Sequence, residues 1–389
     1  MNNRLILFLF AWGIVGCAVS RWRIAGVGGG EILIGLASLL TILKGDFRQL
    51  STPVSRTWGR FVGLSVAAFF TGTLWAGAIG VWEPVSFVHD TLAFAFCFVS
   101  LTLLVPLLTE AHQRSWFLRQ FLRAGIVLAV VNLLFYGFFE LYLGETTRWI
   151  GRFNGVSANP NQLAFYGCLM PFCLLQRPFV LPHWETVLGV GASLGVGWLT
   201  GSDALLLSWL FGFVFLIGQS IHRHSWRVDP SLNTHTKAVV GLIVALIVVG
   251  ILALSRGYAT DIYAIGGQGD LRFHRWQNGL VALHSSPLFG LGPGAFSGDE
   301  KPFRGQEAHN LYIDWMASGG VLAGLVLVWF QGRVWLNLAR TQDIALWSGF
   351  VSLLVFSCFH YVARHPIFWL YHLLMLLKSG RICVASSAR

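Results

Sequence analysis

The sequence predicts an all-α, polytopic integral membrane protein with about 12 transmembrane helices. Hydrophobic residues make up 55% of the 389 residues, charged residues only 11%, and the mean hydropathy is +0.64. A soluble domain carries about a quarter charged residues, so this composition excludes a soluble globular enzyme, a disordered chain and a nucleic-acid-binding module. The net charge of +10 therefore indicates basic residues at the ends of membrane spans.

Apolar runs near the length needed to cross a bilayer fill most of the chain. A hydrocarbon core of about 30 Å requires roughly 20 residues of helix. We expect spans at 5–20, 24–43, 61–82, 86–108, 124–144, 159–176, 185–200, 203–221, 238–255, 310–331, 343–360 and 366–379. The first run lacks a clean small-residue cleavage site, so we expect it to be a span and not a cleaved signal.

The distribution of Lys and Arg predicts that both termini lie on the cytoplasmic side. An even number of spans places the two termini on one side of the membrane. With the N-terminus inside, the inner loops hold 17 of the 27 Lys and Arg, and every inner segment carries at least one. Basic residues favour the cytoplasmic side, so we expect residues 1–389 to form a single membrane domain in this orientation.

One outer loop, residues 256–309 between the ninth and tenth spans, is long and rich in arginine. Within it, 271–284 carries apolar residues at helical spacing, at Phe273, Trp276, Leu280 and Leu283. This spacing predicts an amphipathic helix that lies on or against the membrane face. Long loops cross membranes largely regardless of charge, so the arginines need not have a function. The alternative is a site for an anionic ligand at the outer surface.

Arg272 and Arg275 flank the apolar face of this predicted helix and are candidate phosphate ligands. Arginine offers a planar fork of donors that suits phosphate oxygens. Contact with lipid headgroups is the plain alternative. His274 and His284 have no evident partner in the sequence, and we expect them to be solvated.

His309 lies where the outer loop re-enters the membrane as a helix. Its unperturbed pKa near 6.5 suits proton transfer at neutral pH, and a helix start favours a nearby anion. A capped or solvated histidine is the alternative. The glycine-rich run at 290–294 lacks the strand and helix of a dinucleotide fingerprint, so we expect a tight turn there.

The sequence gives no indication of a metal site or another cofactor. The acidic residues near the outer face, Glu307 among them, form no DxD pair, and no CxxC pair is present. Carboxylates inside membranes are costly and often functional, which makes Asp90 of interest. Asp314 lies at a predicted helix end, where a carboxylate can reach the interface, so we give it little weight.

Three stretches resemble the O-antigen ligase and O-antigen polymerase family of bacterial membrane glycosyltransferases. The first is Arg152-Phe153-Asn154-Gly155 followed by Asn159-Pro160-Asn161-Gln162-Leu163-Ala164. The second is Arg272-x3-Trp276 leading to Pro287-Leu288-x-Gly290-x-Gly292. The third is His309-Asn310-Leu311-Tyr312 followed by Gly319 and Gly320. Their order, the long outer loop and the number of spans all fit this family, over roughly residues 60–380.

The resemblance implies an inner-membrane enzyme with a periplasmic active site in the loop at 256–309. Such enzymes transfer a glycan from undecaprenyl pyrophosphate to an acceptor hydroxyl, with inversion and without a metal. By this match Arg272 and His309 are the expected catalytic residues, and Arg152, Arg275, Asn161 and Asn310 the expected ligands of pyrophosphate or glycan. The expected partners are the lipid-linked donor, the lipid bilayer and other membrane proteins of glycan assembly.

The sequence departs from the family pattern where ligases often have Thr-Gly-Ser-Arg. This chain reads Thr200-Gly201-Ser202-Asp203, so an acid replaces the usual arginine. Two acceptors therefore stay open: lipid A-core, as for an O-antigen ligase, or a growing glycan, as for a polymerase of O-antigen or exopolysaccharide in lipopolysaccharide biosynthesis. A lipid or solute transporter is a third alternative, which predicts an inverted repeat that the sequence does not display.

Overall fold

Helices make up about four-fifths of the described structure, a computed structural model that describes residues 3–24, 26–45, 51–81, 84–142, 148–149, 152–176, 180–225, 268–294, 307–341 and 343–378. The helices are α1 Asn3–Gly16, α2 Gly29–Lys44, α3 Pro53–Ala78, α4 Pro84–Leu107, α5 Ala111–Phe135 continued by the π-helix Tyr136–Tyr142, α6 Pro160–Leu174, α7 His183–Leu199, α8 Asp203–Ser225, α10 Gln268–Ser285, α11 Leu311–Thr341, α12 Ile344–Ser357 and α13 Pro366–Leu377. Two antiparallel hairpins interrupt them, β1 Arg23–Ile24 with β2 Val27–Gly28, and β3 Arg148–Trp149 with β4 Arg152–Phe153.

The all-α prediction is confirmed, and its membrane character is supported. Five helices of the described residues are long and apolar enough to cross a membrane: Pro53–Ala78, Pro84–Leu107, Ala111–Glu140, Asp203–Ser220 and Leu311–Thr341. Eleven of the twelve predicted spans overlap a described helix. The twelfth, at 238–255, lies outside the described residues.

Several helices extend beyond the apolar runs that predicted them. α3 begins at Pro53 and not near residue 61, because Thr52 caps it by accepting a hydrogen bond from the Ser55 amide at 3.2 Å. α11 ends at Thr341 and not near 331. Hydropathy locates the apolar middle of a helix, whereas capping and polar end turns set where the backbone hydrogen bonds begin and end.

The helices alternate in direction, which gives the bundle two distinct ends. At one end, Phe165 in the second turn of α6 packs against Phe356, near the end of α12, and against His365, just before α13. Arg364 reaches Asp90 in the second turn of α4. The starts of α4, α6 and α13 therefore meet the end of α12. We call this the site end.

Both described chain ends lie at the opposite end of the bundle. Asn3 at the start of α1 contacts Gln113, near the start of α5, and Lys44, at the end of α2. After α13, Lys378 pairs with Asp343, which caps the start of α12.

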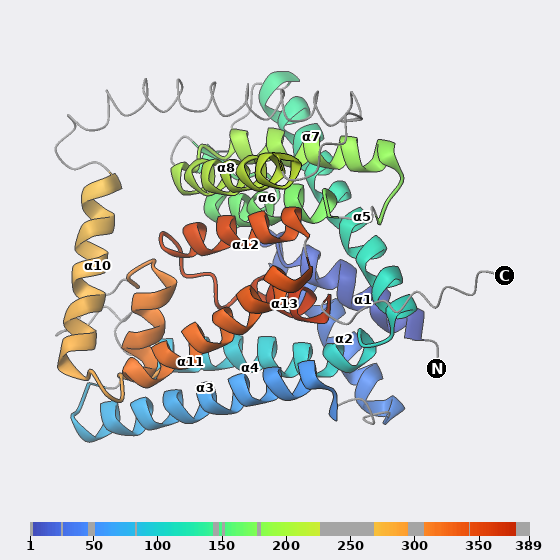
Figure 1. Cartoon of the computed structure of the whole chain (residues 1–389). Coiled ribbons are helices and arrows are strands. Elements are labelled where there is room, and N and C mark those ends of the chain that lie inside the picture. The colour runs from blue at the N-terminus through green and yellow to red at the C-terminus, as the bar shows by residue number, and fades with distance from the viewer. Residues whose placement is uncertain are drawn as a thin grey trace.

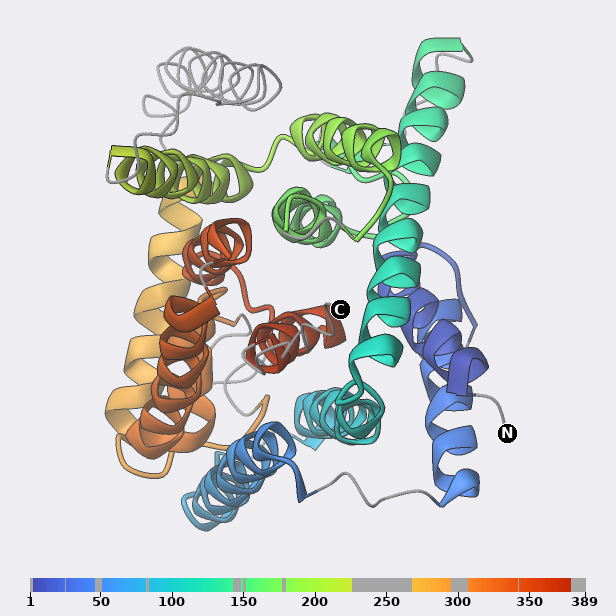
Figure 2. The same cartoon turned by 45° about the vertical axis from the view of Figure 1, so that its right-hand side comes forward.

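Helix α13 is the centre of the bundle, and every one of its residues is buried. Figure 2 shows it surrounded by the other helices. Trp369 fixes the loop before this helix by donating from Nε1 to the Ala363 carbonyl at 2.6 Å. The loop that carries Arg364 is thereby anchored on the most buried helix of the molecule.

Helix α10 lies across the ends of its neighbours, at the left of Figure 1, and packs against α11. The predicted helix at 271–284 is confirmed as part of the helix Gln268–Ser285. Gly279 and Ala282 are buried, whereas Leu280 and Val281 are 50% and 57% exposed. Small residues permit close helix packing, and large apolar residues face outward where lipid is the solvent.

A glycine kink divides α11 into two segments. Gly319 and Gly320 leave the helical conformation, and Gly320 has a φ of +70°. The turn predicted at 290–294 fills this kink: the amides of Leu291 and Gly292 donate to the carbonyls of Ala317 and Ser318, both at 2.8 Å. These amides are used within the protein, in agreement with a turn and not a phosphate loop.

The close crossing of α1 and α2 offers a test of the packing. A Cβ on Gly30 would lie 2.2 Å from the Cys17 backbone nitrogen, whereas a Cβ on Gly35, in the same helix, meets nothing within 4 Å. We predict that Gly30→Ala lowers the free energy of unfolding by about 1–3 kcal/mol through overpacking. Thermal unfolding in detergent measures it, with Gly35→Ala as the control. Equal melting temperatures for the two variants would contradict this packing.

Candidate active site

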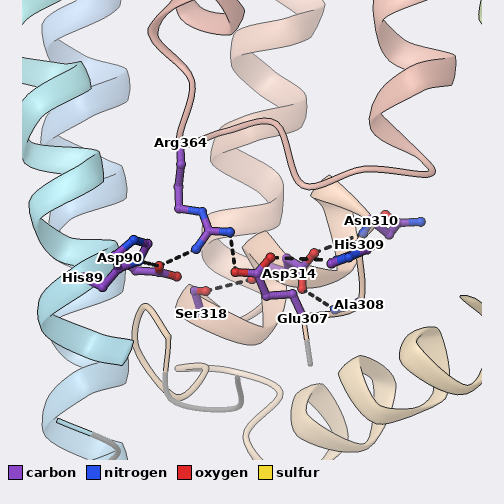
Figure 3. A network of polar contacts seen from close by, with 9 residues as sticks. All are labelled: His89, Asp90, Glu307, Ala308, His309, Asn310, Asp314, Ser318 and Arg364. Atoms are coloured by element: carbon purple, nitrogen blue, oxygen red, sulfur yellow. Dashed lines mark hydrogen bonds and ion pairs between the residues drawn. The ribbon is translucent and has the colours of Figure 1, made fainter. Parts of the chain in front are cut away.

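Arg364 joins three parts of the chain at the site end (Figure 3). One terminal nitrogen contacts the Asp90 carboxylate on α4, and the other contacts the Glu307 carboxylate before α11, both at 2.5 Å. The guanidinium also lies 5.2 Å from the centre of the Tyr361 ring. A guanidinium that donates to two carboxylates is fixed in one orientation. Because one of these carboxylates belongs to Glu307, the segment at 307–310 is fixed against the bundle.

The charges of this network stabilise one another. Burial alone would lower the pKa of Arg364, but Glu307 and Asp90 outweigh burial and raise it. Burial also raises the pKa of the Glu307 carboxyl, against the opposing effect of Arg364. Buried charges of this kind are costly unless they are paired, so Arg364 is what keeps two carboxylates in place at this end.

His309 lies beside this network in an unusual backbone conformation. Its φ is +53°, and it is the one non-glycine residue with a positive φ in the described part of the chain. Its Nδ1 lies 3.9 Å from the Glu307 carboxylate, and its side chain is 35% exposed. Strained backbone conformations of this kind persist only where the surrounding structure enforces them.

Asp314 enforces the conformation of His309. One of its carboxylate oxygens accepts from the Ala308 amide at 2.7 Å, and the other accepts from the Asn310 amide at 3.1 Å. The Asp314 side chain is completely buried. The backbone is therefore held on both sides of His309 by a single carboxylate.

Asn310 caps helix α11. Its side-chain oxygen accepts from the amides of Tyr312 at 3.0 Å and Ile313 at 3.3 Å. Capping satisfies amides at the helix start that have no partner within the helix. The carboxamide oxygen of Asn310 is thus used in the fold, and a contact of this residue with substrate stays a prediction.

Helix α10 packs directly on the segment that carries His309. A Cβ on Gly279 would lie 2.8 Å from the Ala308 Cβ and 2.5 Å from Ile313. One turn earlier, Trp276 lies against Phe359, with ring centres 6.0 Å apart. Arg275 precedes Trp276 and is half-buried, and Arg272 lies one turn earlier in α10. The side chain of Arg272 lies outside the described residues.

Arg152 and Asn161, two of the predicted ligands, contact each other. The Arg152 guanidinium donates to the Asn161 side-chain oxygen at 2.8 Å and to the Thr200 carbonyl at 2.9 Å. Asn161 is held in the first turn of α6, where the Asn159 side chain accepts from its amide. Arg152 therefore lies against the Thr200–Gly201 turn. Asp203, the acid found where O-antigen ligases often have arginine, follows Thr200 by three residues.

The Arg152 pair and the Arg364 network lie at the same end of the bundle. Phe165, one turn after Asn161 on α6, packs against His365, and Arg364 is the preceding residue. Residues from the loops before α6, α11 and α13 thus converge at the site end. These loops are far apart in the sequence, and only the alternation of helices brings them together.

From the sequence, Asp90 and Glu307 were considered singly, and neither was paired with Arg364. Each was a charge in or near an apolar stretch, which is a signal of function or of pairing in membrane proteins. Their partners could not be assigned, because Asp90 and Arg364 are 274 residues apart. The importance of Asp314 was not predicted, because a carboxylate at a helix end was expected to reach the interface. The structure shows that its side chain is fully buried.

Among the residues that the structure describes, no group of three His, Cys, Asp or Glu could hold a metal ion. The described cysteines, Cys17, Cys97, Cys168, Cys173 and Cys358, are free thiols. A scan against protein-family models and a search of curated proteins find no match to this chain.

The Arg364 network makes a prediction about stability. We expect Arg364→Gln to lower the free energy of unfolding by about 2 kcal/mol or more, because two buried carboxylates lose their counter-charge. The loss should shrink between pH 8 and pH 5. Without Arg364 the folded-state pKa of Glu307 exceeds its unfolded value further, so the folded state binds the extra proton and gains stability as the pH falls.

Chemical unfolding in detergent at the two pH values measures this effect. Arg333→Gln is the control, because Arg333 is exposed on α11. An equal and pH-independent loss in both variants would contradict the pairing of Arg364 with the two carboxylates.

Proposed function

We propose that this protein is a glycosyltransferase of the inner membrane that transfers a glycan from a polyprenyl diphosphate to an acceptor hydroxyl. The observation that carries the proposal is the contact between α10 and the Ala308–Ile313 turn. It joins the helix that bears Arg272 and Arg275 to the segment that bears His309. The resemblance of these segments to the O-antigen ligase and polymerase family supports the same reaction.

The proposed reaction needs a cationic site for its leaving group. The acceptor oxygen forms a bond with the anomeric carbon while the bond from that carbon to the diphosphate oxygen breaks. The polyprenyl diphosphate leaves with the bonding electrons and gains negative charge. Guanidinium groups fixed at that position stabilise the transition state more than the ground state. Arg272, Arg275 and Arg152 are the proposed ligands of the diphosphate or the glycan.

His309 is the proposed general base. A sugar hydroxyl is a poor nucleophile, so removal of its proton during attack lowers the barrier. The imidazole takes that proton and later returns it to solvent. A side chain that is one-third exposed and directed by its neighbours suits this role, because the acceptor must reach it from water. The proposed mechanism uses no metal, as the resemblance implies: the arginines bind the diphosphate, and His309 takes the proton of the acceptor.

The position of the site suits a lipid-linked donor. The polyprenyl chain stays in the bilayer beside the apolar helices, and its polar headgroup reaches the end of the bundle. We place the site end in the periplasm and both termini in the cytoplasm, as the distribution of Lys and Arg predicts. The outward-facing Leu280 and Val281 support an α10 that borders lipid.

We favour lipid A-core as the acceptor, as for an O-antigen ligase. A growing glycan, as for a polymerase, is the second candidate, because Asp203 replaces the arginine common in ligases. Deletion of the gene distinguishes the two. Loss of all long glycan on lipid A-core, with lipid-linked polymer accumulating, indicates a ligase. Lipid A-core that carries only a single glycan repeat unit indicates a polymerase.

A transport function makes a different prediction. Purified protein in detergent, incubated with lipid-linked glycan and an acceptor, has no compartments to transport between. Formation of a glycosylated acceptor under these conditions supports the enzyme and excludes a pure transporter. Absence of transfer with every donor and acceptor pair tested would contradict the proposed function.

We predict that His309→Ala lowers kcat for glycan transfer by about 100-fold or more, because the general base is lost. Binding of the lipid-linked donor should change little. Transfer and donor binding are measured on purified protein, with His112→Ala as the control, since the His112 side chain is 77% exposed and lies in the first turn of α5, at the opposite end of the bundle. Full activity in the His309→Ala variant would contradict the role of His309 as general base.

We predict that Arg272→Lys still costs roughly tenfold or more in kcat/KM, although the charge is kept. Lysine is a point charge and lacks the planar fork that binds two phosphate oxygens. The control is Arg119→Lys, at an exposed position of α5. If lysine serves as well as arginine at residue 272, bidentate binding of the diphosphate is wrong.

A further inference from the structure

We propose that Glu307 and Asp314 are positioning residues that act through His309, Glu307 on its ring and Asp314 on its backbone. The proposal rests on the proposed function, in which His309 is the base. Figure 3 shows both carboxylates beside His309, with Arg364 behind Glu307. Neither carboxylate needs to touch the substrate for this role.

The backbone argument begins with the left-handed conformation of His309. A residue with a Cβ adopts a φ of +53° only at a cost, so the chain around it must compensate. The two amides on either side of His309 both donate to Asp314. Because a carboxylate accepts at both oxygens, it can hold two amides at once, which an amide or hydroxyl side chain cannot do equally well.

The location of Asp314 holds its carboxylate, and with it these two hydrogen bonds, in a fixed position. Asp314 lies in the first turn of α11, and its own carbonyl accepts from the Ser318 hydroxyl at 2.8 Å, just before the glycine kink. The short segment of α11 before that kink is packed against α10 through Ile313. The direction of the His309 side chain is therefore coupled to the helix that carries the proposed diphosphate ligands.

The ring argument begins with Glu307. Its carboxylate lies 3.9 Å from His309 Nδ1, and Arg364 holds it from the other side at 2.5 Å. A carboxylate near one ring nitrogen favours a proton there, which directs the other nitrogen to accept a proton from the acceptor. Asp90 fixes Arg364 in turn, so a chain of charged contacts runs from α4 to the ring.

The charges beside His309 come from several elements packed at the site end. Glu307 belongs to its own segment and Asp314 to α11, Arg364 to the loop before α13, Asp90 and His89 to α4, and Arg275 to α10. Glu307 is the carboxylate that lies beside the ring, 3.9 Å from Nδ1. A purely structural role for it and Asp314 would affect stability and all activities alike, whereas a positioning role acts only when His309 is present.

A double-mutant cycle separates these roles. We expect Glu307→Gln and Asp314→Asn each to lower kcat by on the order of tenfold or more, with KM for the donor within about twofold. In the His309→Ala background the same changes should cost less than about twofold, since residues that act as a unit are not additive. If Glu307→Gln and Asp314→Asn lower kcat as much in the His309→Ala background as in the wild type, the proposal is overturned.

Asp343→Asn is the matched control for these variants. Asp343 also caps a helix with its carboxylate, by accepting from the Leu346 amide at 3.2 Å, but it lies at the opposite end of the bundle. Its loss should leave kcat unchanged within about twofold in both backgrounds.

Site-resolved acylation by diethyl pyrocarbonate gives a readout that needs no glycan transfer. The reagent attacks neutral imidazole, and mass spectrometry compares the rate at His309 with the rate at exposed His112 in the same sample. At pH 6 we expect the relative rate to rise at least twofold in Glu307→Gln, because the ring loses the carboxylate that lies beside its Nδ1 and is no longer held in one orientation. It should rise in Asp314→Asn as well, because the ring loses its fixed direction, and stay constant in Asp343→Asn.

An unchanged relative rate in both site variants would overturn the positioning of His309. The acylation result stands independently of the transfer assay. If the wild-type protein transfers no glycan, the proposed function fails while acylation still decides whether Glu307 and Asp314 control His309. If transfer occurs and acylation is unchanged, the function stands and the positioning proposal fails.

Discussion

The ion pairs of Arg364 hold together the end of the molecule where the candidate site lies. A guanidinium between two carboxylates is an expensive feature in an otherwise apolar bundle, and it persists because each charge is paired within hydrogen-bonding distance. Arg364 is anchored by the fully buried α13, so its position is set by the core. Arg364 holds the segment at 307–310 onto that core through Glu307, and Asp314 then sets the backbone conformation of His309.

Glycine makes the second half of the arrangement possible. Gly279 lets α10 approach the segment that carries His309, and the kink at Gly319 and Gly320 lets the first turns of α11 lie against α10. A β-carbon at Gly320 would lie 2.0 Å from the Leu288 carbonyl oxygen, so the turn at 287–292 fits only around a glycine. Helix α10 and the start of α11 therefore form one unit, and this unit joins the proposed phosphate ligands to the proposed base.

The sequence predicted the helical class, the overlap of eleven apolar runs with helices, and the helix near 271–284, because hydropathy and helical periodicity are local properties. It could not predict which face of α10 packs on protein, since in lipid the largest apolar residues, such as Leu280, face outward. Of the candidate site, the contact of Arg152 with Asn161 lies within one stretch of chain and was accessible to motif reading. The pairing of Arg364 with Asp90 depends on the order of helices in the bundle, which no local pattern encodes.

The central claim is that α10 and the start of α11 bind the diphosphate of a lipid-linked donor. The most direct measurement is photolabelling of the protein in lipid nanodiscs with a photoreactive polyprenyl diphosphate, followed by peptide mapping. We expect the label within 268–285 or 307–320, and we expect unlabelled polyprenyl diphosphate to compete for it. Label confined to the opposite end of the bundle, beside Lys44 or Lys378, would contradict the claim.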